Sequence, residues 1–299
     1  MQYTTLGKSN LTISRLALGT MSITDLPSAK SIIATALDQG VNYFDTADLY
    51  QKGENEKMVG QVLKPHRKDL ILATKVGNQW RTDGSGWDWN PRKAYLKKAV
   101  HDSLRRLKTD YIDLYQLHGG TIDDPIDEAI EAFEELIQEG HIRYYGISSI
   151  RHNVIHCYGT TSNIISNMMQ YSLLDRRPEE WALDFLRKQE IGVIVRGAIG
   201  KGLLAGKPPQ GKTLAQAAPN GFTTVEELQT GMAKLGDSEY SLADLAIQYV
   251  LAHPGVSTIA LGASNAAQLA ATLKAIDSPP LDAVQLEALR QMSPVWQYE

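Results

Sequence analysis

The feature that most constrains the fold is a repeated alternation of a short apolar segment with an amphipathic helical pattern. Each apolar segment is hydrophobic throughout, as expected for a parallel strand that is buried on both faces. Parallel strands that are joined through helices need right-handed crossovers, and eight such units close into a barrel. The sequence therefore predicts a (β/α)8 TIM barrel with an N-terminal hairpin at 2–13. We expect strands at 15–18, 41–44, 70–74, 111–117, 142–147, 163–169, 192–195 and 256–261.

The helical pattern is clearest at 92–108, and weaker patterns follow the other predicted strands. In this segment the apolar positions recur at the spacing of one helix face. This face consists of Leu96, Ala99, Val100, Ser103, Leu104 and Leu107, of which Ser103 is the one polar residue. Similar reasoning predicts a helix at 54–63 and another after Pro125, with a buried stripe of Ile126, Ala129, Ile130, Phe133 and Ile137. No linker of Pro and Ser divides the chain, so we expect a single domain over 1–299.

Composition and charge exclude several classes of protein. Lys and Arg number 30 and Asp and Glu 34, which gives a net charge of −4 without a basic run, so we expect no nucleic-acid partner. No apolar run approaches the roughly 18 residues that a membrane span needs. The N-terminus has no signal-peptide pattern. The single cysteine, Cys157, cannot form an internal disulfide, which favours a reducing compartment and a cytoplasmic location.

Four side chains with acid–base chemistry occur at or just after successive predicted strands. Asp45, Lys75 and His118 follow the second, third and fourth strands, and Tyr50 lies in the loop after the second. Neighbouring strands lie about 4.8 Å apart, so these groups can converge at the C-terminal opening of the barrel. A single residue of this kind usually caps a helix or faces solvent. Four suitable types at successive strand ends predict a catalytic site.

The four residue types fit the reduction of a carbonyl group. A phenol has a pKa of about 10 and is a poor acid at neutral pH. An ammonium group beside it favours the phenolate, and a carboxylate keeps that ammonium charged and in place. We therefore expect Lys75 and Asp45 to make Tyr50 a general acid that protonates the substrate oxygen. His118 would donate a hydrogen bond that fixes the substrate carbonyl.

The chain resembles the aldo-keto reductase family over residues 1–275. The resemblance implies an NADPH-dependent reductase of small aldehydes or ketones, with Asp45, Tyr50, Lys75 and His118 as its catalytic tetrad and without a metal. Nicotinamide would supply the hydride, and the protein would position cofactor and carbonyl. The motifs that carry the resemblance are Phe-Asp-Thr-Ala-Asp-Leu-Tyr at 44–50, Gly-Glu-Asn-Glu at 53–56, Ala-Thr-Lys at 73–75, Tyr-Ile-Asp-Leu-Tyr-Gln-Leu-His at 111–118, Gly-His-Ile-Arg-Tyr-Tyr-Gly-Ile-Ser-Ser at 140–149 and Tyr-Ser-Leu-Leu-Asp-Arg at 171–176.

The resemblance also implies a set of residues that bind NADP(H). Arg196 occupies a position where relatives usually have an aromatic ring against the nicotinamide, and a guanidinium can also stack on a flat ring. Segment 262–268 has no Lys or Arg for a 2′-phosphate, so Lys201, Lys207 and Lys212 are alternative sources of charge. The implied cofactor residues are Gly19, Thr20, Met21, Asp45, Ser148, Gln170, Arg196, Gly197, Lys201, Leu203, Gly262, Ser264 and Gln268.

The sequence also contains patterns that are typical of other classes of protein. Residues 206–213 match the P-loop pattern, but no strand immediately precedes them and Pro208 and Pro209 remove needed N–H donors, so we reject an NTPase. His152 and His156 have the spacing of a helical zinc pair but no third ligand. The main alternative is a nicotinamide-sensing binding subunit with little turnover. Residues 76–91 and 197–222 are expected to be irregular loops at the site.

Overall fold

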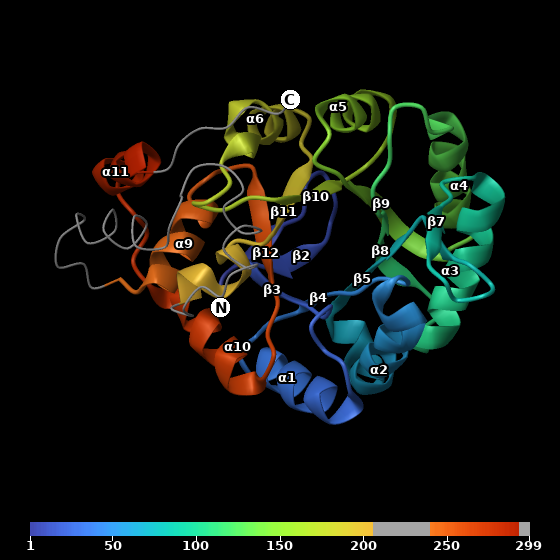
Figure 1. Cartoon of the computed structure of the whole chain (residues 1–299), viewed down its shortest axis with the longest axis horizontal. Coiled ribbons are helices and arrows are strands. Elements are labelled where there is room, and N and C mark those ends of the chain that lie inside the picture. Colours follow the sequence, from blue (N-terminus) through green and yellow to red (C-terminus); the bar gives the residue numbers. More distant parts are fainter. Residues whose placement is uncertain (206–239, 293–299) are drawn as a thin grey trace.

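Eight parallel strands form a closed barrel in the computed structural model, which describes residues 1–205 and 240–292 (Figure 1). The eighth strand pairs with the first through Ile259 and Leu16, and this pairing closes the cylinder. The predicted TIM barrel is thus confirmed. The strands are β3 (Leu16–Gly19), β4 (Tyr43–Asp45), β5 (Ile71–Val76), β8 (Ile112–Leu117), β9 (Ile142–Ser148), β10 (Ser166–Gln170), β11 (Gly192–Arg196) and β12 (Val256–Leu261).

Helices surround the barrel, with α11 at the edge of the ring (Figure 1). Local sequence sets several of their ends. Asp25 accepts a hydrogen bond from the backbone N–H of Ser28 and so caps α1, and Ser241 and Asp244 form a reciprocal capping box on α9. The helices are α1 (Leu26–Asp38), α2 (Glu54–Leu63), α3 (Lys93–Leu107), α4 (Ile126–Gln138), α5 (His152–Thr161), α6 (Ala182–Lys188), α9 (Leu242–Leu251), α10 (Ala266–Leu273) and α11 (Ala283–Met292).

The packing of α4 differs from the predicted stripe. Ala132 and Leu136 are fully buried, whereas Ile130 and Ile137 are only half-buried. The buried face is therefore rotated from the predicted one toward Ala132 and Leu136. None of the helices in the described part of the chain has the length and apolar composition to cross a membrane.

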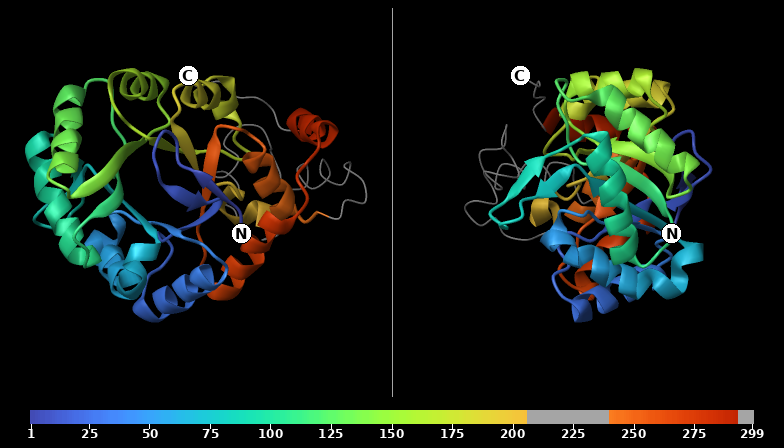
Figure 2. Two further views of the ribbon diagram at one scale, coloured as in Figure 1. Left: turned by 180° about the vertical axis from the view of Figure 1, so that it is seen from behind. Right: turned by 90° about the vertical axis from the view of Figure 1, so that its right-hand side faces the viewer.

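The N-terminal hairpin closes one end of the barrel. Its strands are β1 (Tyr3–Thr5) and β2 (Thr12–Ser14), which lie at one end of the barrel (Figure 2). Leu6, Leu11 and Ile13 pack into the barrel interior. Burial of one such side chain stabilises a fold by about 1.5–3 kcal/mol. The hairpin fills the N-terminal opening, so a substrate can reach the interior residues only from the opposite end.

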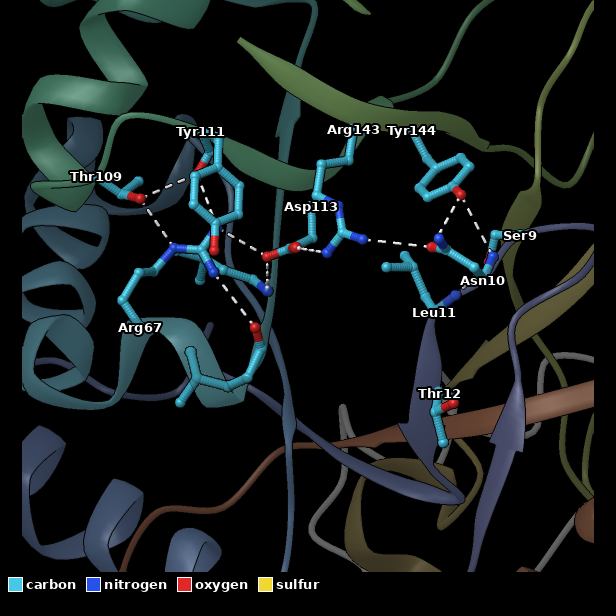
Figure 3. Close-up of polar contacts among 12 residues, drawn as sticks. Ser9, Asn10, Leu11, Thr12, Arg67, Thr109, Tyr111, Asp113, Arg143 and Tyr144 are labelled. Atoms are coloured by element: carbon cyan, nitrogen blue, oxygen red, sulfur yellow. Dashed lines mark hydrogen bonds and ion pairs between the residues drawn. The ribbon is translucent and has the colours of Figure 1, made fainter. Parts of the chain in front are cut away.

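Asp113 links the hairpin end of the barrel to the strands around it (Figure 3). Its buried carboxylate is 2.8 Å from Arg67 and accepts a 2.9 Å hydrogen bond from Arg143. Arg143 also donates to the side-chain oxygen of Asn10, at 3.3 Å, and Tyr144 donates to the same oxygen at 3.0 Å. A buried carboxylate that is paired in this way stabilises the arrangement of the strands, because loss of either partner would leave a charge unpaired.

The segment predicted as an irregular loop at 76–91 contains a second hairpin. Its strands are β6 (Asn78–Trp80) and β7 (Trp87–Trp89), and it lies on the side opposite the N-terminal hairpin (Figure 2). The ring of Trp89 covers Gly77, where an added Cβ would be 2.5 Å from the ring. The indole of Trp89 also donates to Asp124 at 3.0 Å. Trp89 therefore fixes the second hairpin to Gly77 and to Asp124.

Candidate active site

The structure brings the four predicted acid–base side chains together at the C-terminal opening. Asp45 ends β4, His118 follows β8, and Tyr50 begins the short 3-10 helix Tyr50–Gly53. Lys75 lies within β5, one residue beyond the predicted strand end. Its ammonium group donates to Asp45 and lies 3.4 Å from the Tyr50 hydroxyl. The rings of Tyr50 and His118 are perpendicular, with centroids 6.1 Å apart.

Lys75 is charged although its side chain is only 1% exposed. Burial lowers the pKa of Lys75, but the neighbouring oxygens of Asp45 and Tyr50 outweigh this effect and the net shift is upward. The ammonium group also donates to the backbone oxygen of Thr46 at 2.7 Å. Three oxygens therefore surround the buried cation, and one of them belongs to the phenol.

Gln116 is a part of this cluster that the sequence analysis missed. Its side-chain amide donates to the second oxygen of Asp45 at 3.1 Å, so Lys75 and Gln116 each take one carboxylate oxygen. Gln116 is fully buried in β8, in register with Lys75. A signal was present, because Gln116 is a polar residue in an apolar strand, two positions before His118 and therefore on the same face.

His118 is neutral at physiological pH. Burial, together with the positive charges of Lys75 and Arg196, lowers the pKa of His118 to about 3. Its backbone N–H donates to Val76 at 2.8 Å, which fixes the residue at the strand end. A neutral imidazole has one N–H donor and one acceptor nitrogen. The His118 ring can thus donate a hydrogen bond but cannot supply a proton as imidazolium near pH 7.

A cavity of about 410 Å³ runs from Tyr50 to the first turn of α10. This volume lies in the range of small-molecule sites. Met168 contributes to the wall in addition to the predicted residues, whereas Ser148 and Leu203 do not line it. The side chain of Lys201 and all of Lys207 and Lys212 lie outside the described residues. The predicted cofactor residues that line the cavity are Gly19, Thr20, Met21, Asp45, Gln170, Arg196, Gly197, Gly262, Ser264 and Gln268.

Ser148 and Leu203 stay predictions as cofactor residues, and local structure explains why neither lines the cavity. Ser148 is the last residue of β9 and is half-buried, and the cavity wall next to it is formed by β10 instead. Leu203 is 4% exposed in a 3-10 helix, Gly200–Ala205, and packs into the core between the barrel and α9. Backbone atoms at Gly200 and Gly202 line the cavity in its place.

Arg196 is held in the cavity wall by a chain of polar contacts. It ends β11 in register with Gln170, the last residue of β10, and donates to the Gln170 oxygen at 3.0 Å. Gln170 donates in turn to Asp175 at 3.1 Å. Asp175 accepts two hydrogen bonds of 2.7 Å from Arg177. These contacts hold the Arg196 guanidinium in the cavity wall, and the sequence alone did not reveal them.

Asn55 fixes the loop at Thr20 on the other side of the cavity. Its side-chain oxygen accepts hydrogen bonds of 2.7 Å from the hydroxyls of Thr20 and Thr46. Its amide donates to the backbone oxygens of Thr20 and Ile23, each at 2.9 Å. All four contacts are buried, so the loop after β3 and the loop after β4 have one fixed relative position.

The cavity has features that fit a nicotinamide dinucleotide. One end is formed by Asp45 and Tyr50, and the other end lies at Gly262 and Ser264. Gly262 leaves room for close approach, and the first turn of α10 offers backbone N–H groups of the kind that bind phosphate. The residues that would hold the cofactor therefore lie on or directly after five strands around one opening.

The other candidate sites from the sequence gain no support. His156 stacks on Phe185 with ring centroids 5.4 Å apart, so this histidine is part of an aromatic cluster between α5 and α6. Within 1–205 and 240–292, no three His, Cys, Asp or Glu residues are grouped to hold a metal ion. The P-loop match at 206–213 lies outside the described residues.

Comparison with known proteins agrees with this arrangement. Residues 15–294 match the profile of the aldo/keto reductase family. The chain belongs to this family. This aldo/keto reductase is therefore an oxidoreductase, and its family generally uses NAD(P)H on small carbonyl compounds.

Three relatives of this aldo/keto reductase are informative. An uncharacterized oxidoreductase of Bacillus subtilis, YqkF, is 50% identical over 95% of this chain and 94% of its own length. The holo form of aldo-keto reductase AKR11C1 from Bacillus halodurans is 50% identical, with a TM-score of 0.93 over 100% of this chain and 98% of that one. A probable voltage-gated potassium channel subunit beta of Arabidopsis thaliana is 28% identical over 94% of this chain and 93% of its own.

Proposed function

We propose that the protein transfers a hydride from NADPH to the carbonyl carbon of small aldehydes or ketones, with Tyr50 as the general acid. The observation that supports this most directly is the position of the Tyr50 hydroxyl, 3.4 Å from the buried ammonium group of Lys75 and at the end of the cavity. Asp45 keeps that ammonium group charged. The four residues then act as a tetrad in which only Tyr50 and His118 touch the substrate.

In this proposal the carbonyl oxygen lies between Tyr50 and His118. The reduced nicotinamide supplies the hydride when the cofactor is bound. Tyr50 gives its proton to the oxygen, and the phenolate that results is stabilised by the adjacent charge of Lys75. The positive charge is more effective here than in water because Lys75 lies in a low-dielectric environment.

His118 has a different role from Tyr50. Because its pKa is lowered to about 3, the imidazole stays neutral and donates a hydrogen bond to the carbonyl oxygen. This bond orients the carbonyl and strengthens as negative charge develops on oxygen. The proton itself comes from the phenol.

Cofactor binding is assigned to the cavity wall in the same proposal. Arg196 would lie against the nicotinamide, since it lines the cavity, its charge acts on His118 and its guanidinium donates to Gln170. The turn at Gly262 and Ser264 would face the phosphates. We take NADPH as the preferred cofactor and the cytoplasm as the location, in line with the single cysteine, which is not in a disulfide.

The test follows the consumption of NADPH and of NADH with a panel of aldehydes, for the wild type and for Tyr50→Phe. We expect Tyr50→Phe to lower kcat by about 10²–10⁴-fold, the usual contribution of general acid catalysis, with little change in cofactor affinity. Absence of turnover with every carbonyl tested, or an undiminished rate in Tyr50→Phe, would disprove the proposal.

The second candidate is a nicotinamide-binding regulatory subunit with little turnover. The similarity to a potassium channel subunit beta and the guanidinium at Arg196 favour it. A multiple-turnover experiment, with NADPH and aldehyde in large excess over protein, distinguishes the two functions. An enzyme oxidises many equivalents of NADPH per chain in the presence of aldehyde, whereas a sensing subunit binds NADPH tightly and stops after one.

A further inference from the structure

The turn that carries Tyr50 has an unusual backbone. Gln51 and Lys52 have φ values of 51° and 57°, and Gly53 follows at 86°, so three consecutive residues are left-handed. This conformation is costly for residues that have a Cβ atom, and it normally occurs singly. Lys108 and Glu190 are the only other non-glycine residues with positive φ in the described part of the chain. Such conformations persist where the surroundings hold them, and they cluster at functional sites.

The buried end of the turn is held by α3. Gly53 lies against the Arg106 side chain, and an added Cβ would be 2.7 Å from its Cδ. Arg106 donates to Glu56 at 2.6 Å, and Glu56 is completely buried and also accepts a 2.6 Å hydrogen bond from Thr74. Gly53 therefore rests on an ion pair that is itself fixed to β5.

The exposed end of the turn is held by Lys52. Its ammonium group lies 5.1 Å from the centroid of the Trp80 ring and donates to the backbone oxygen of Gly84 at 3.3 Å. Trp80 ends β6, and Gly84 lies in the connection between β6 and β7. A cation over a tryptophan face is the most favourable form of this contact. Lys52 thus ties the turn after Tyr50 to the hairpin at the opening of the barrel.

Tyr50 depends on this tie more than the other members of the tetrad do. Asp45 and Lys75 lie within barrel strands and His118 directly follows one, so the sheet fixes their positions. Tyr50 lies five residues beyond β4, on the strained turn. Its 3.4 Å separation from Lys75 is already long for a hydrogen bond, so a small displacement of the turn would separate the two groups.

We propose that Lys52 is a positioning residue that holds Tyr50 against Lys75 by anchoring the left-handed turn to the hairpin β6–β7. This inference rests on the proposed role of Tyr50 as the acid. An exposed lysine usually contributes little to stability. We therefore expect the loss of Lys52 to change activity more than the free energy of unfolding. The two quantities can change in opposite directions, because the left-handed backbone that directs Lys52 toward the hairpin is itself unfavourable.

Three variants of Lys52 test the proposal. Lys52→Met removes the charge and keeps the strain, and we expect kcat to fall about tenfold with the KM for NADPH unchanged. Lys52→Arg restores the cation and should retain most of the activity. Lys52→Gly relieves the strain but loses the anchor, so its thermal midpoint should rise while its kcat falls as in Lys52→Met.

Lys108 offers a matched control, because it is an exposed lysine at φ 55° that ends α3 away from the cavity. Lys108→Gly should raise the thermal midpoint and leave kcat unchanged. Hydrogen exchange of the amides at 50–53 gives a readout besides turnover, and exchange should be faster in Lys52→Met than in the wild type.

The outcomes separate the two proposals. Wild-type kcat in Lys52→Met and Lys52→Gly would overturn the role of Lys52, as would a loss of activity in Lys52→Arg as large as in Lys52→Met. Unchanged amide exchange at 50–53 in Lys52→Met would also overturn it. If the wild type itself turned over no carbonyl, the proposed function would fail, whereas the exchange measurement would still show whether Lys52 anchors the turn.

Discussion

Two buried carboxylates at opposite ends of the barrel have similar burial but different partners. Asp113, near the N-terminal hairpin, contacts two arginines, Arg67 at 2.8 Å and Arg143 at 2.9 Å (Figure 3). Asp45, at the cavity, is paired with Lys75. Both carboxylates are almost completely inaccessible to water, at 1% and 5% side-chain exposure. Burial and charge pairing alone therefore do not identify the functional carboxylate.

The two sites differ in the other groups that the cation contacts. The arginines around Asp113 are permanently charged, and the remaining contact of the carboxylate is the backbone N–H of Leu72 at 3.0 Å. The groups around Asp113 therefore have a structural role. Lys75 also lies beside a phenol that can release a proton. We infer that Asp113 stabilises the barrel, whereas Asp45 stabilises a charge that acts on Tyr50.

The largest expected effect on this comparison comes from Lys75→Met. Removal of the ammonium group leaves the Tyr50 phenolate without its stabilising charge, so we expect kcat/KM to fall by about 10³-fold. Asp45 can take up a proton when its partner is lost, which limits the effect on stability. Carbonyl-dependent NADPH oxidation and thermal unfolding, measured on the same preparation, check both parts. A variant with near-normal kcat/KM would remove Lys75 from the mechanism.

Asp113→Asn should lower stability and leave activity unchanged, the opposite of the effects expected for Lys75→Met. Arg67 and Arg143 would lose their shared carboxylate, and breaking such a buried pair costs about 3–5 kcal/mol of unfolding free energy. We expect a lower denaturant midpoint and an unchanged kcat at temperatures where the variant is folded. A large loss of kcat in the folded variant would contradict the division between the two ends of the barrel.

Gln116→Leu should have a smaller effect on activity, about tenfold on kcat, because one oxygen of Asp45 would lose its only neutral donor. Gln248 provides a matched control. It is also a buried amide and donates to the backbone oxygen of Ala275 at 2.7 Å, between α9 and the segment after α10. Gln248→Leu should lower stability similarly and leave kcat unchanged. Equal kcat in both variants would show that Gln116 does not act through Asp45.

The last prediction concerns the pH dependence of stability. The pKa of His118 is lowered from 6.5 to about 3 in the folded protein, so the unfolded chain binds the proton more readily. His118 therefore contributes stability that is present above 6.5 and is lost as the pH falls toward 3. In His118→Gln this part of the acid dependence should be absent. An identical decline of the unfolding free energy in both proteins would show that His118 is not buried in the neutral form.

The barrel and the four acid–base residues could be predicted from sequence because both depend on local pattern. Each strand is a short apolar run, and Asp45, Lys75 and His118 stand at the ends of such runs. The hairpin β6–β7 could not be predicted, since its strands are three residues long and rich in tryptophan and polar residues. Its order comes from contacts such as the 3.0 Å hydrogen bond from Trp89 to Asp124, 35 positions away, and such contacts leave no periodic signal.

The supporting contacts were missed for a related reason. Gln116 reaches Asp45 across 71 positions of the chain, and Asn55 reaches Thr20 across 35. Such pairings depend on the closed barrel and not on neighbouring residues. The cofactor role of Ser148 and Leu203 comes from the resemblance and stays a prediction, and neither residue lines the cavity.

The most direct test of the central claim is a double-mutant cycle of Lys75→Met and Tyr50→Phe. If Lys75 acts through Tyr50, the double variant should have nearly the same kcat/KM as Tyr50→Phe alone, because the charge has no phenolate left to stabilise. Asp113→Asn in the Tyr50→Phe background should leave kcat/KM unchanged, as in the wild type. Losses that multiply in the Lys75→Met and Tyr50→Phe pair would contradict the account.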